Sequence, residues 1–217
     1  MIRRIGEPRS GRRAASAPSP AQRLRGALLI GSLLVAGLAA PAQAEPRRWV
    51  PLAGKSRVAF DASFPLGNFT GATEDLAGTF HADPDDLREP VKGALTVKAG
   101  SLRTGVAERD RDVWKALAVE RYPEIRFAVE RVEASFPSVT DRADVLLTVT
   151  GRMEIRGVER PVVFPGRVRL QEGKLWVRGE TMLQLSAFGI PPPRRLLFFS
   201  VRDDLLVRFD VLLTRAE

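Results

Sequence analysis

Residues that could perform catalysis or bind a metal are few in this 217-residue chain. The chain has no cysteine and a single histidine, His81, so it lacks the residues for a thiolate nucleophile or a zinc site of several Cys and His ligands. His81 could act as a ligand or as a base. It follows Phe80, however, and precedes the acidic turn Pro84-Asp85-Asp86, a position more typical of a solvated loop edge.

The acidic residues give no clearer catalytic pattern. Asp85-Asp86 and Asp203-Asp204 fall at predicted turns, where Asp is common because its side chain bonds to the nearby backbone. The sequence also has no G-x-S-x-G elbow before a helix, and neither a phosphate-binding loop nor a G-x-G-x-x-G motif after a strand. We therefore assign no catalytic residue and no metal ligand, and we expect a protein that is not an enzyme.

The phenylalanines form the most informative set. Each of six falls on the apolar face of a predicted strand: Phe60, Phe64, Phe80, Phe127, Phe164 and Phe209. A single such residue is most often part of a filled core. Together, on many strands, they could either fill the interior or line an apolar tunnel, and the pattern alone leaves both open.

The elements that carry these residues are predicted to be strands, because apolar residues recur at every second position. The clearest case is a hairpin in which Arg156 to Glu159 form a charged turn, with Gly157 free to adopt a positive φ. The alternating apolar residues on either side are Val145, Leu147, Val149, Met153, Ile155, Val162 and Phe164.

The whole pattern predicts roughly eight antiparallel strands and one helix. Gly105–Glu120 has apolar residues at helical spacing, and Gly67–Asp75 is polar and contains glycine, which predicts a loop or bulged turn. Pro191–Pro193 excludes a central strand there. Strands are predicted at 58–64, 76–81, 91–97, 125–129, 145–155, 162–170, 175–185 and 205–213, with 49–52 a weaker candidate.

This pattern predicts an all-β fold. Eight strands are enough for a closed barrel that holds one small ligand, and closure removes exposed sheet edges. A sandwich with a filled core is the alternative, and periodicity favours the barrel without excluding the sandwich.

The first forty-four residues are predicted to be a secretory signal. Seven Arg in residues 1–25 precede the apolar run Gly26–Ala40, and Ala42-Gln43-Ala44 supplies the small residues that a signal peptidase reads. A membrane anchor is the alternative, but the apolar run is shorter than the ~20 residues of a spanning helix. We expect cleavage before Glu45 and a periplasmic or secreted protein, with the Sec or Tat route left open.

Removing this segment changes the charge balance. The whole chain carries a formal charge of +8, but without the seven Arg and one Glu of residues 1–44 it has 27 basic and 25 acidic residues. A net charge of +2 is far below the positive charge typical of a nucleic-acid-binding domain. Residues 45–217 have a length that suits a single domain.

Several motifs, in order, resemble those of the YceI-like family of exported polyisoprenoid-binding proteins. The similarity covers nearly all of residues 49–215. It rests on Trp49 with Ser56–Phe60, Gly78–Phe80, Ser101–Gly105 with Arg109-Asp110, Tyr122–Phe127, Gly151–Val162, Phe188–Ile190 and Val201–Leu213.

The resemblance implies an extended antiparallel lipocalin-like β-barrel, with a short helix over one end and a long apolar tunnel for an isoprenoid chain. The tunnel-lining candidates are Phe60, Phe64, Phe80, Leu95, Phe127, Val149, Ile155, Phe164, Phe188 and Phe209. The expected ligand is an isoprenoid quinone or a polyprenyl lipid, with no other cofactor.

Three functions remain at this point. We expect a periplasmic carrier or binder of a long isoprenoid, acting as a monomer or homodimer with transient contact to a membrane or a redox protein. A structural or stress-protective protein with a filled core is the second hypothesis. An enzyme, such as a hydrolase or a cyclase built in a barrel, is the third, and it would need a polar constellation inside the barrel that the sequence does not offer.

Overall fold

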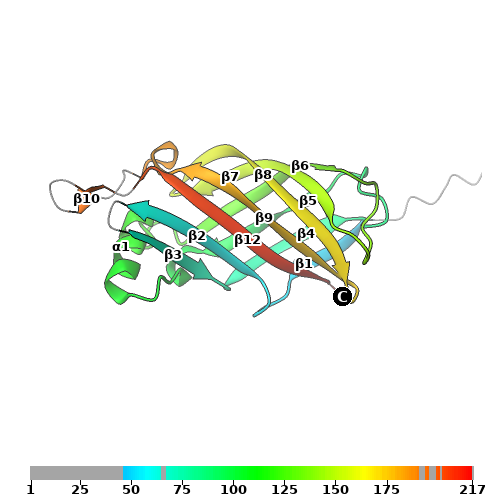
Figure 1. Ribbon diagram of the computed structural model, residues 1–217, viewed down its shortest axis with the longest axis horizontal. Helices are drawn as coiled ribbons and strands as arrows, with labels where there is room; N and C mark the ends of the chain where they lie inside the picture. Colours follow the sequence, from blue (N-terminus) through cyan, green and yellow to red (C-terminus); the bar gives the residue numbers. More distant parts are fainter. Residues whose placement is uncertain (1–45, 65–66, 191–193, 196–198, 201, 217) are drawn as a thin grey trace, which may run out of the picture. The chain divides into compact units, whose positions relative to one another are not determined.

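The computed structural model describes residues 46–64, 67–190, 194–195, 199–200 and 202–216, and the backbone alone at Phe64, 194–195 and 199–200. The predicted signal segment 1–44 and Pro191–Pro193 lie outside these ranges. Long antiparallel strands run obliquely around a central interior, and helix α1 (Ala107–Leu117) lies at the end opposite the C-terminus (Figure 1). Within the described ranges, no helix combines the length and the hydropathy that a bilayer crossing requires.

The strands of the main sheet follow one another in chain order with one exception. They are β1 (Arg47–Pro51), β2 (Arg57–Phe64), β3 (Gly67–Thr73), β4 (Leu76–Ala82), β5 (Lys92–Lys98), β6 (Glu124–Ala134), β7 (Val145–Ile155), β8 (Val158–Gln171), β9 (Lys174–Gln184) and β12 (Asp204–Arg215). The short strands β10 (Arg194–Arg195) and β11 (Phe199–Ser200) pair separately, and the 3-10 helices η1 (Ala99–Ser101) and η2 (Leu185–Phe188) follow β5 and β9.

Eight of the described strands close into a barrel. The order is β1-β4-β5-β6-β7-β8-β9-β12, and β12 pairs back onto β1 with Leu213 opposite Pro51. The hairpin β2–β3 is the exception to the simple ring, because β2 pairs with the first half of β12, from Leu205 to Asp210. The predicted barrel is therefore confirmed over the sandwich.

Ser56 makes it possible for β12 to change partners. β12 pairs with β2 up to Asp210 and with β1 from Leu213 onward. Leu212 lies between these two stretches, so its backbone N–H and C=O need hydrogen-bond partners outside both pairings. The buried Ser56 hydroxyl lies 3.1 Å from Leu212 N and 3.2 Å from Leu212 O, and Leu52 N donates to the same carbonyl at 2.7 Å. The serine thus satisfies the backbone where the barrel wall splits.

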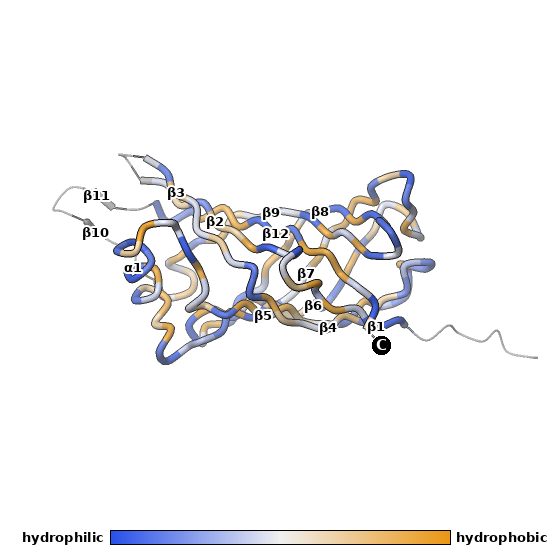
Figure 2. The backbone as a smooth tube through the Cα atoms, turned by 90° about the horizontal axis from the view of Figure 1, so that it is seen from below, coloured by the Kyte–Doolittle hydropathy of each residue, from blue (hydrophilic) through white to orange (hydrophobic). Residues whose placement is uncertain are grey.

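Two tight turns fix the register of the longest strands. The β7–β8 turn has φ of 55° at Arg156 and 71° at Gly157, and the β8–β9 turn has 50° at Glu172 and 73° at Gly173. Positive φ at both central residues is the type I′ geometry that matches the twist of hairpin strands. With register fixed, polar and apolar residues alternate along the strands, as Figure 2 shows, and Phe127 is half-buried while Arg126 is exposed.

The prediction of a loop or bulged turn at Gly67–Asp75 was wrong. Residues 67–73 form strand β3, not a loop, and pair with β2 so that Gly71 lies opposite Phe60. Gly71 is accommodated in this strand because it lies beneath the phenyl ring, where a side chain would not fit. The predicted helix, in contrast, is confirmed at residues 107–117.

Candidate functional site: an apolar tunnel

A cavity of about 930 Å³ occupies the interior of the barrel. Leu205 and Leu213 both line it, eight residues apart on β12, so it extends about 26 Å along that strand at ~3.3 Å per residue. Its volume is near the upper end of the ~300–1,000 Å³ typical of ligand pockets. The interior is therefore a tunnel that could accept an elongated molecule.

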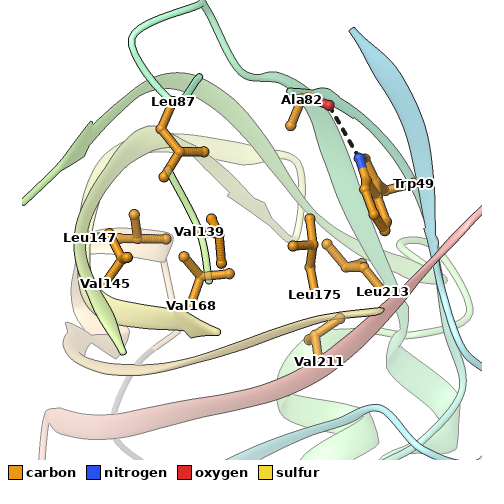
Figure 3. Packing of buried hydrophobic residues seen from close by; sticks show 10 residues of the cluster. All are labelled: Trp49, Ala82, Leu87, Val139, Val145, Leu147, Val168, Leu175, Val211 and Leu213. Carbon is orange, nitrogen blue, oxygen red and sulfur yellow. Dashed lines mark hydrogen bonds between the residues drawn. The ribbon is translucent and has the colours of Figure 1, made fainter. Parts of the chain in front are cut away.

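Apolar packing and two loops lie at the end of the tunnel nearest β1. Apolar side chains gather there, as Figure 3 shows, and Trp49 donates from Nε1 to the carbonyl of Ala82 at 3.2 Å. Two loops cross this end and are hydrogen-bonded to each other. Leu87 N donates to Pro137 O at 2.6 Å, and Val139 N donates to Pro84 O at 2.8 Å. This packing makes an apolar floor.

Glycines beneath the phenyl rings keep the centre of the tunnel open. A Cβ built on Gly71 would lie 2.3 Å from the Phe60 ring, and one built on Gly179 would lie 2.6 Å from the Phe209 ring. A Cβ on Gly93 would lie 2.6 Å from the Phe80 ring and one on Gly151 2.7 Å from the Phe127 ring, although at these two glycines and at Gly179 a backbone oxygen lies closer still. The rings occupy space that a side chain on the neighbouring strand would need, so they cover the wall and leave the centre free.

The burial of these rings agrees with an open interior. Phe60, Phe80, Phe127 and Phe209 all belong to the tunnel wall, yet each is only half-buried. In a filled barrel such side chains would lose nearly all of their accessible surface.

Three of the phenyl rings form a continuous aromatic wall. Phe164 is 4 % exposed and meets Phe127 edge to face, with ring centroids 4.9 Å apart, and Phe209 likewise at 5.2 Å. Edge-to-face pairs of this kind each add ~0.5–1.5 kcal/mol beyond their buried area. These contacts help to hold the three rings against the wall.

The structure places most of the predicted lining residues on this cavity. Phe60, Phe80, Leu95, Phe127, Val149, Ile155, Phe164 and Phe209 all line it, and the side chain of Phe64 lies outside what is described. Phe188 does not line it: η2 begins after β9 ends, so strand alternation no longer sets its direction. Its ring is 3 % exposed and packs with Met153 and Ile155. Ligand contact by any of these residues stays a prediction.

Charged residues line the tunnel only where it meets α1, within the described part of the chain. They are Glu108, Arg109, Asp112 and Lys115 of α1, and Arg156 of the β7–β8 turn; the other described lining residues are all apolar. Sequence reasoning gave these residues no role, although it quoted Arg109-Asp110 as a motif. Only the helix's packing over the barrel end brings them to the tunnel.

Asp110 fixes the start of this helix to the preceding loop. Its Oδ1 accepts hydrogen bonds from the backbone N and the hydroxyl of Thr104, both at 2.6 Å, and the residue is buried. The Thr104 hydroxyl above all, then its backbone N–H and the charges of Arg103 and Arg109, lower the pKa of Asp110. The carboxylate is thus a structural anchor for the tunnel end.

His81 is exposed on β4, away from the tunnel lining, as the sequence suggested. Among the described residues, no three His, Cys, Asp or Glu side chains lie close enough together to hold a metal ion. Among the described residues, the charged side chains that line the tunnel are therefore those at its α1 end.

These features define a closed antiparallel β-barrel with an apolar cavity, and comparison with known proteins gives its family. Residues 49–213 match the YceI-like domain, so the chain belongs to the YceI-like family. Two curated relatives, UPF0312 proteins from Pseudomonas putida strains F1 and KT2440, are each 32% identical over 132 residues. That match covers 57% of this chain and 64% of each relative's length.

Solved structures share the fold. BcnA from Burkholderia cenocepacia has a TM-score of 0.64 and 18% identity, with 76% of this chain and 99% of BcnA covered. A polyisoprenoid binding domain from Saccharophagus degradans has a TM-score of 0.63 and 15% identity, with 77% and 98% covered. The YCEI protein of Campylobacter jejuni has a TM-score of 0.56 and 19% identity, with 70% and 86% covered.

Proposed function

We propose that this protein binds and carries a long-chain isoprenoid lipid, such as a polyprenyl lipid or an isoprenoid quinone, in the barrel tunnel. The observation that carries the proposal is the elongated apolar cavity of about 930 Å³, with its charged residues confined to one end. A tunnel of this lining offers water almost no hydrogen-bond partners, so filling it with an apolar chain is favourable. Each CH₂ transferred from water gains ~0.8 kcal/mol before ordering costs.

The family and one structural relative support this choice of ligand. The Saccharophagus degradans domain, which shares the fold, is described as polyisoprenoid binding. An isoprenoid chain is long, narrow and branched with methyl groups, which suits a tunnel walled by Phe, Val and Leu. The lipid is the ligand, and the role needs no cofactor and no catalysis.

The proposed location is the periplasm, reached after cleavage before Glu45. A carrier there must exchange its lipid with a membrane or with a protein that uses the lipid. The order of charged, apolar and small residues in 1–44 supports export.

Val149→Trp tests whether the tunnel is the binding site. Val149 lines the cavity and packs against two groups of buried apolar residues, one around Trp49 and Leu213 and the other around Phe164 and Phe188, so it lies between the β1 end and the α1 end. A Trp side chain at this position would extend into the cavity and should prevent the lipid chain from entering. Thr148→Trp is the matched control, because Thr148 is the preceding residue on β7 and is exposed.

Binding of ubiquinone and of a polyprenol should be measured for the wild type and both variants, together with the thermal midpoint. We expect Val149→Trp to weaken binding at least tenfold with a folded protein, and Thr148→Trp to bind like the wild type. Equal binding by the wild type and Val149→Trp, or no binding by the wild type, would overturn the proposal.

A further inference from the structure

The floor at the β1 end of the tunnel is packed tightly, whereas the part of the tunnel beyond it is not. Trp49, Leu87 and Val139 border the cavity at this floor and are only 3 %, 9 % and 6 % exposed. Phe127 and Phe209, which line the cavity beyond the floor, are half-buried. An interior side chain keeps accessible surface where it borders a void and loses it where packing is dense. The free volume of the tunnel therefore ends at the floor.

The α1 end of the tunnel, in contrast, is in contact with water. Glu108, Asp112 and Lys115 of α1 line the tunnel there, and all three are exposed. Water and charged side chains can solvate the polar head of a lipid, whereas the apolar floor would leave that head without hydrogen-bond partners. A lipid in this tunnel should therefore lie with its head at α1 and the end of its tail against the floor.

Leu87 is a floor residue whose side chain can be shortened without breaking a backbone bond. It belongs to the loop between β4 and β5. The loop is tied down through the backbone N–H of this residue, which donates to Pro137 O at 2.6 Å and which any side chain would leave in place. The isobutyl group of Leu87 is similar in size and branching to one isoprene unit. A smaller residue here would therefore give the end of the lipid tail room to extend.

Val177 is a residue at which the floor can be extended into the cavity. It is half-buried, lines the cavity and packs against the floor. On the neighbouring strands it lies opposite Val211 of β12 and Val168 of β8, both of which are buried. A larger side chain at Val177 has the cavity to extend into, so it would shorten the tunnel without overpacking the floor.

We propose that the floor selects the length of the isoprenoid chain, with Leu87 and Val177 as residues that determine this specificity. A chain that is too short leaves part of the cavity unfilled, and one that is too long leaves its remaining carbons in water at α1. Each CH₂ left in water forfeits about fourfold in affinity, so a difference of one isoprene unit is enough for selection. This inference rests on the proposed function and adds chain length as a property by which the ligand is recognised.

The test is the extraction of polyprenols that differ by one isoprene unit from phosphatidylcholine vesicles. Every homologue is buried in the vesicle, so differences in extraction report the fit to the tunnel, and the wild type should extract one length best. Leu87→Ala removes three carbons from the floor and should favour the next longer homologue over the preferred one by about tenfold more than the wild type does. Val177→Phe should shift the optimum to a shorter homologue. Leu146→Ala is the matched control, because Leu146 is 63 % exposed and does not line the tunnel.

The outcomes separate this inference from the proposed function. Equal extraction of all lengths by the wild type, an optimum that is the same in both floor variants, or a shift in Leu146→Ala equal to that in Leu87→Ala would overturn the length selection and leave lipid binding intact. If the wild type extracts neither a polyprenol nor ubiquinone of any tail length, the proposed function itself is wrong. Should Leu87→Ala fail to fold, Val177→Phe decides alone: an optimum unchanged from the wild type overturns the inference.

Discussion

Gly71→Ala tests the claim that glycines under the phenyl rings keep the tunnel open. The new Cβ would lie 2.3 Å from Cε1 and Cζ of Phe60, so the ring must retreat by about 1.2–1.7 Å to reach ordinary contact. The nearest atoms to this Cβ belong to the Phe60 side chain and not to the backbone. The ring should therefore turn toward the tunnel while β3 stays paired with β2.

The cost in stability should be small. Displacing the ring costs ~0.5–1.5 kcal/mol in rotamer strain. Weakening its edge-to-face contact with Phe69, at a centroid distance of 6.1 Å, costs up to ~0.5–1.5 kcal/mol. The lower entropy of the unfolded chain offsets ~0.4–1 kcal/mol of this. The net change is between a gain of ~0.5 and a loss of ~2.6 kcal/mol, or a fall in Tm of at most ~10 °C for a chain of this size.

The assay combines thermal unfolding with lipid affinity, read from quenching of tryptophan fluorescence by ubiquinone, since Trp49 lines the tunnel. We expect Gly71→Ala to bind at least tenfold more weakly. Gly100→Ala is the control, because no atom lies within 4 Å of the Cβ that it would add. Unchanged affinity in Gly71→Ala would refute the argument that the glycine makes room for the ring, and a loss of stability far above ~3 kcal/mol would indicate a filled interior.

Two further predictions concern the register and the anchor of α1. Phe127→Asp should destabilise the protein by at least ~3 kcal/mol, because it removes an aromatic contact and places a charge on an apolar wall. Arg126→Asp, on the outer face, should cost under ~1 kcal/mol. Equal shifts of the urea midpoint in the two variants would contradict this register. Asp110→Asn should lower Tm most at neutral pH, because a carboxylate whose pKa is lowered on folding stabilises the protein above its unfolded pKa of about 4 and loses that effect as pH falls through the folded value. A difference in Tm between wild type and Asp110→Asn that does not shrink below about pH 4 would argue against the Thr104 anchor.

Much of the fold could be predicted because local signals agreed. Alternation placed Phe127 inward and Arg126 outward, and the Arg156-Gly157 and Glu172-Gly173 turns are visible as local composition. Such signals need only neighbouring residues. The number of strands favoured a barrel without excluding a sandwich. Closure involves a change of partner along β12 near Ser56, which no local pattern reveals.

The tunnel could not be predicted from the pattern, because an inward phenylalanine fills or lines a barrel depending on what lies on the next strand. Gly71 in particular was counted as evidence for a loop, whereas its function is to make room for Phe60. Phe188 was misplaced for a related reason, since the strand ends at Gln184 and the following 3-10 turn points the ring elsewhere. Each of these depends on a contact between elements, which alternation does not encode.

The charged end of the tunnel was missed because it is made by packing between elements. Arg109 and Lys115 belong to a helix whose residues were read for their apolar spacing, and Arg156 was read as part of a turn. Their common position is visible only once α1 lies over the barrel end. The Arg109-Asp110 motif, which the family resemblance already included, was a signal that could have directed attention there.

The most direct test of the central claim is mass spectrometry of an organic extract of the protein purified from its native source. If the tunnel binds an isoprenoid, the extract should contain a long-chain isoprenoid in near-stoichiometric amount, and Val149→Trp prepared in parallel should contain much less. A protein that yields no lipid, and that binds neither added ubiquinone nor added polyprenol, would contradict the account and favour a structural role for the barrel.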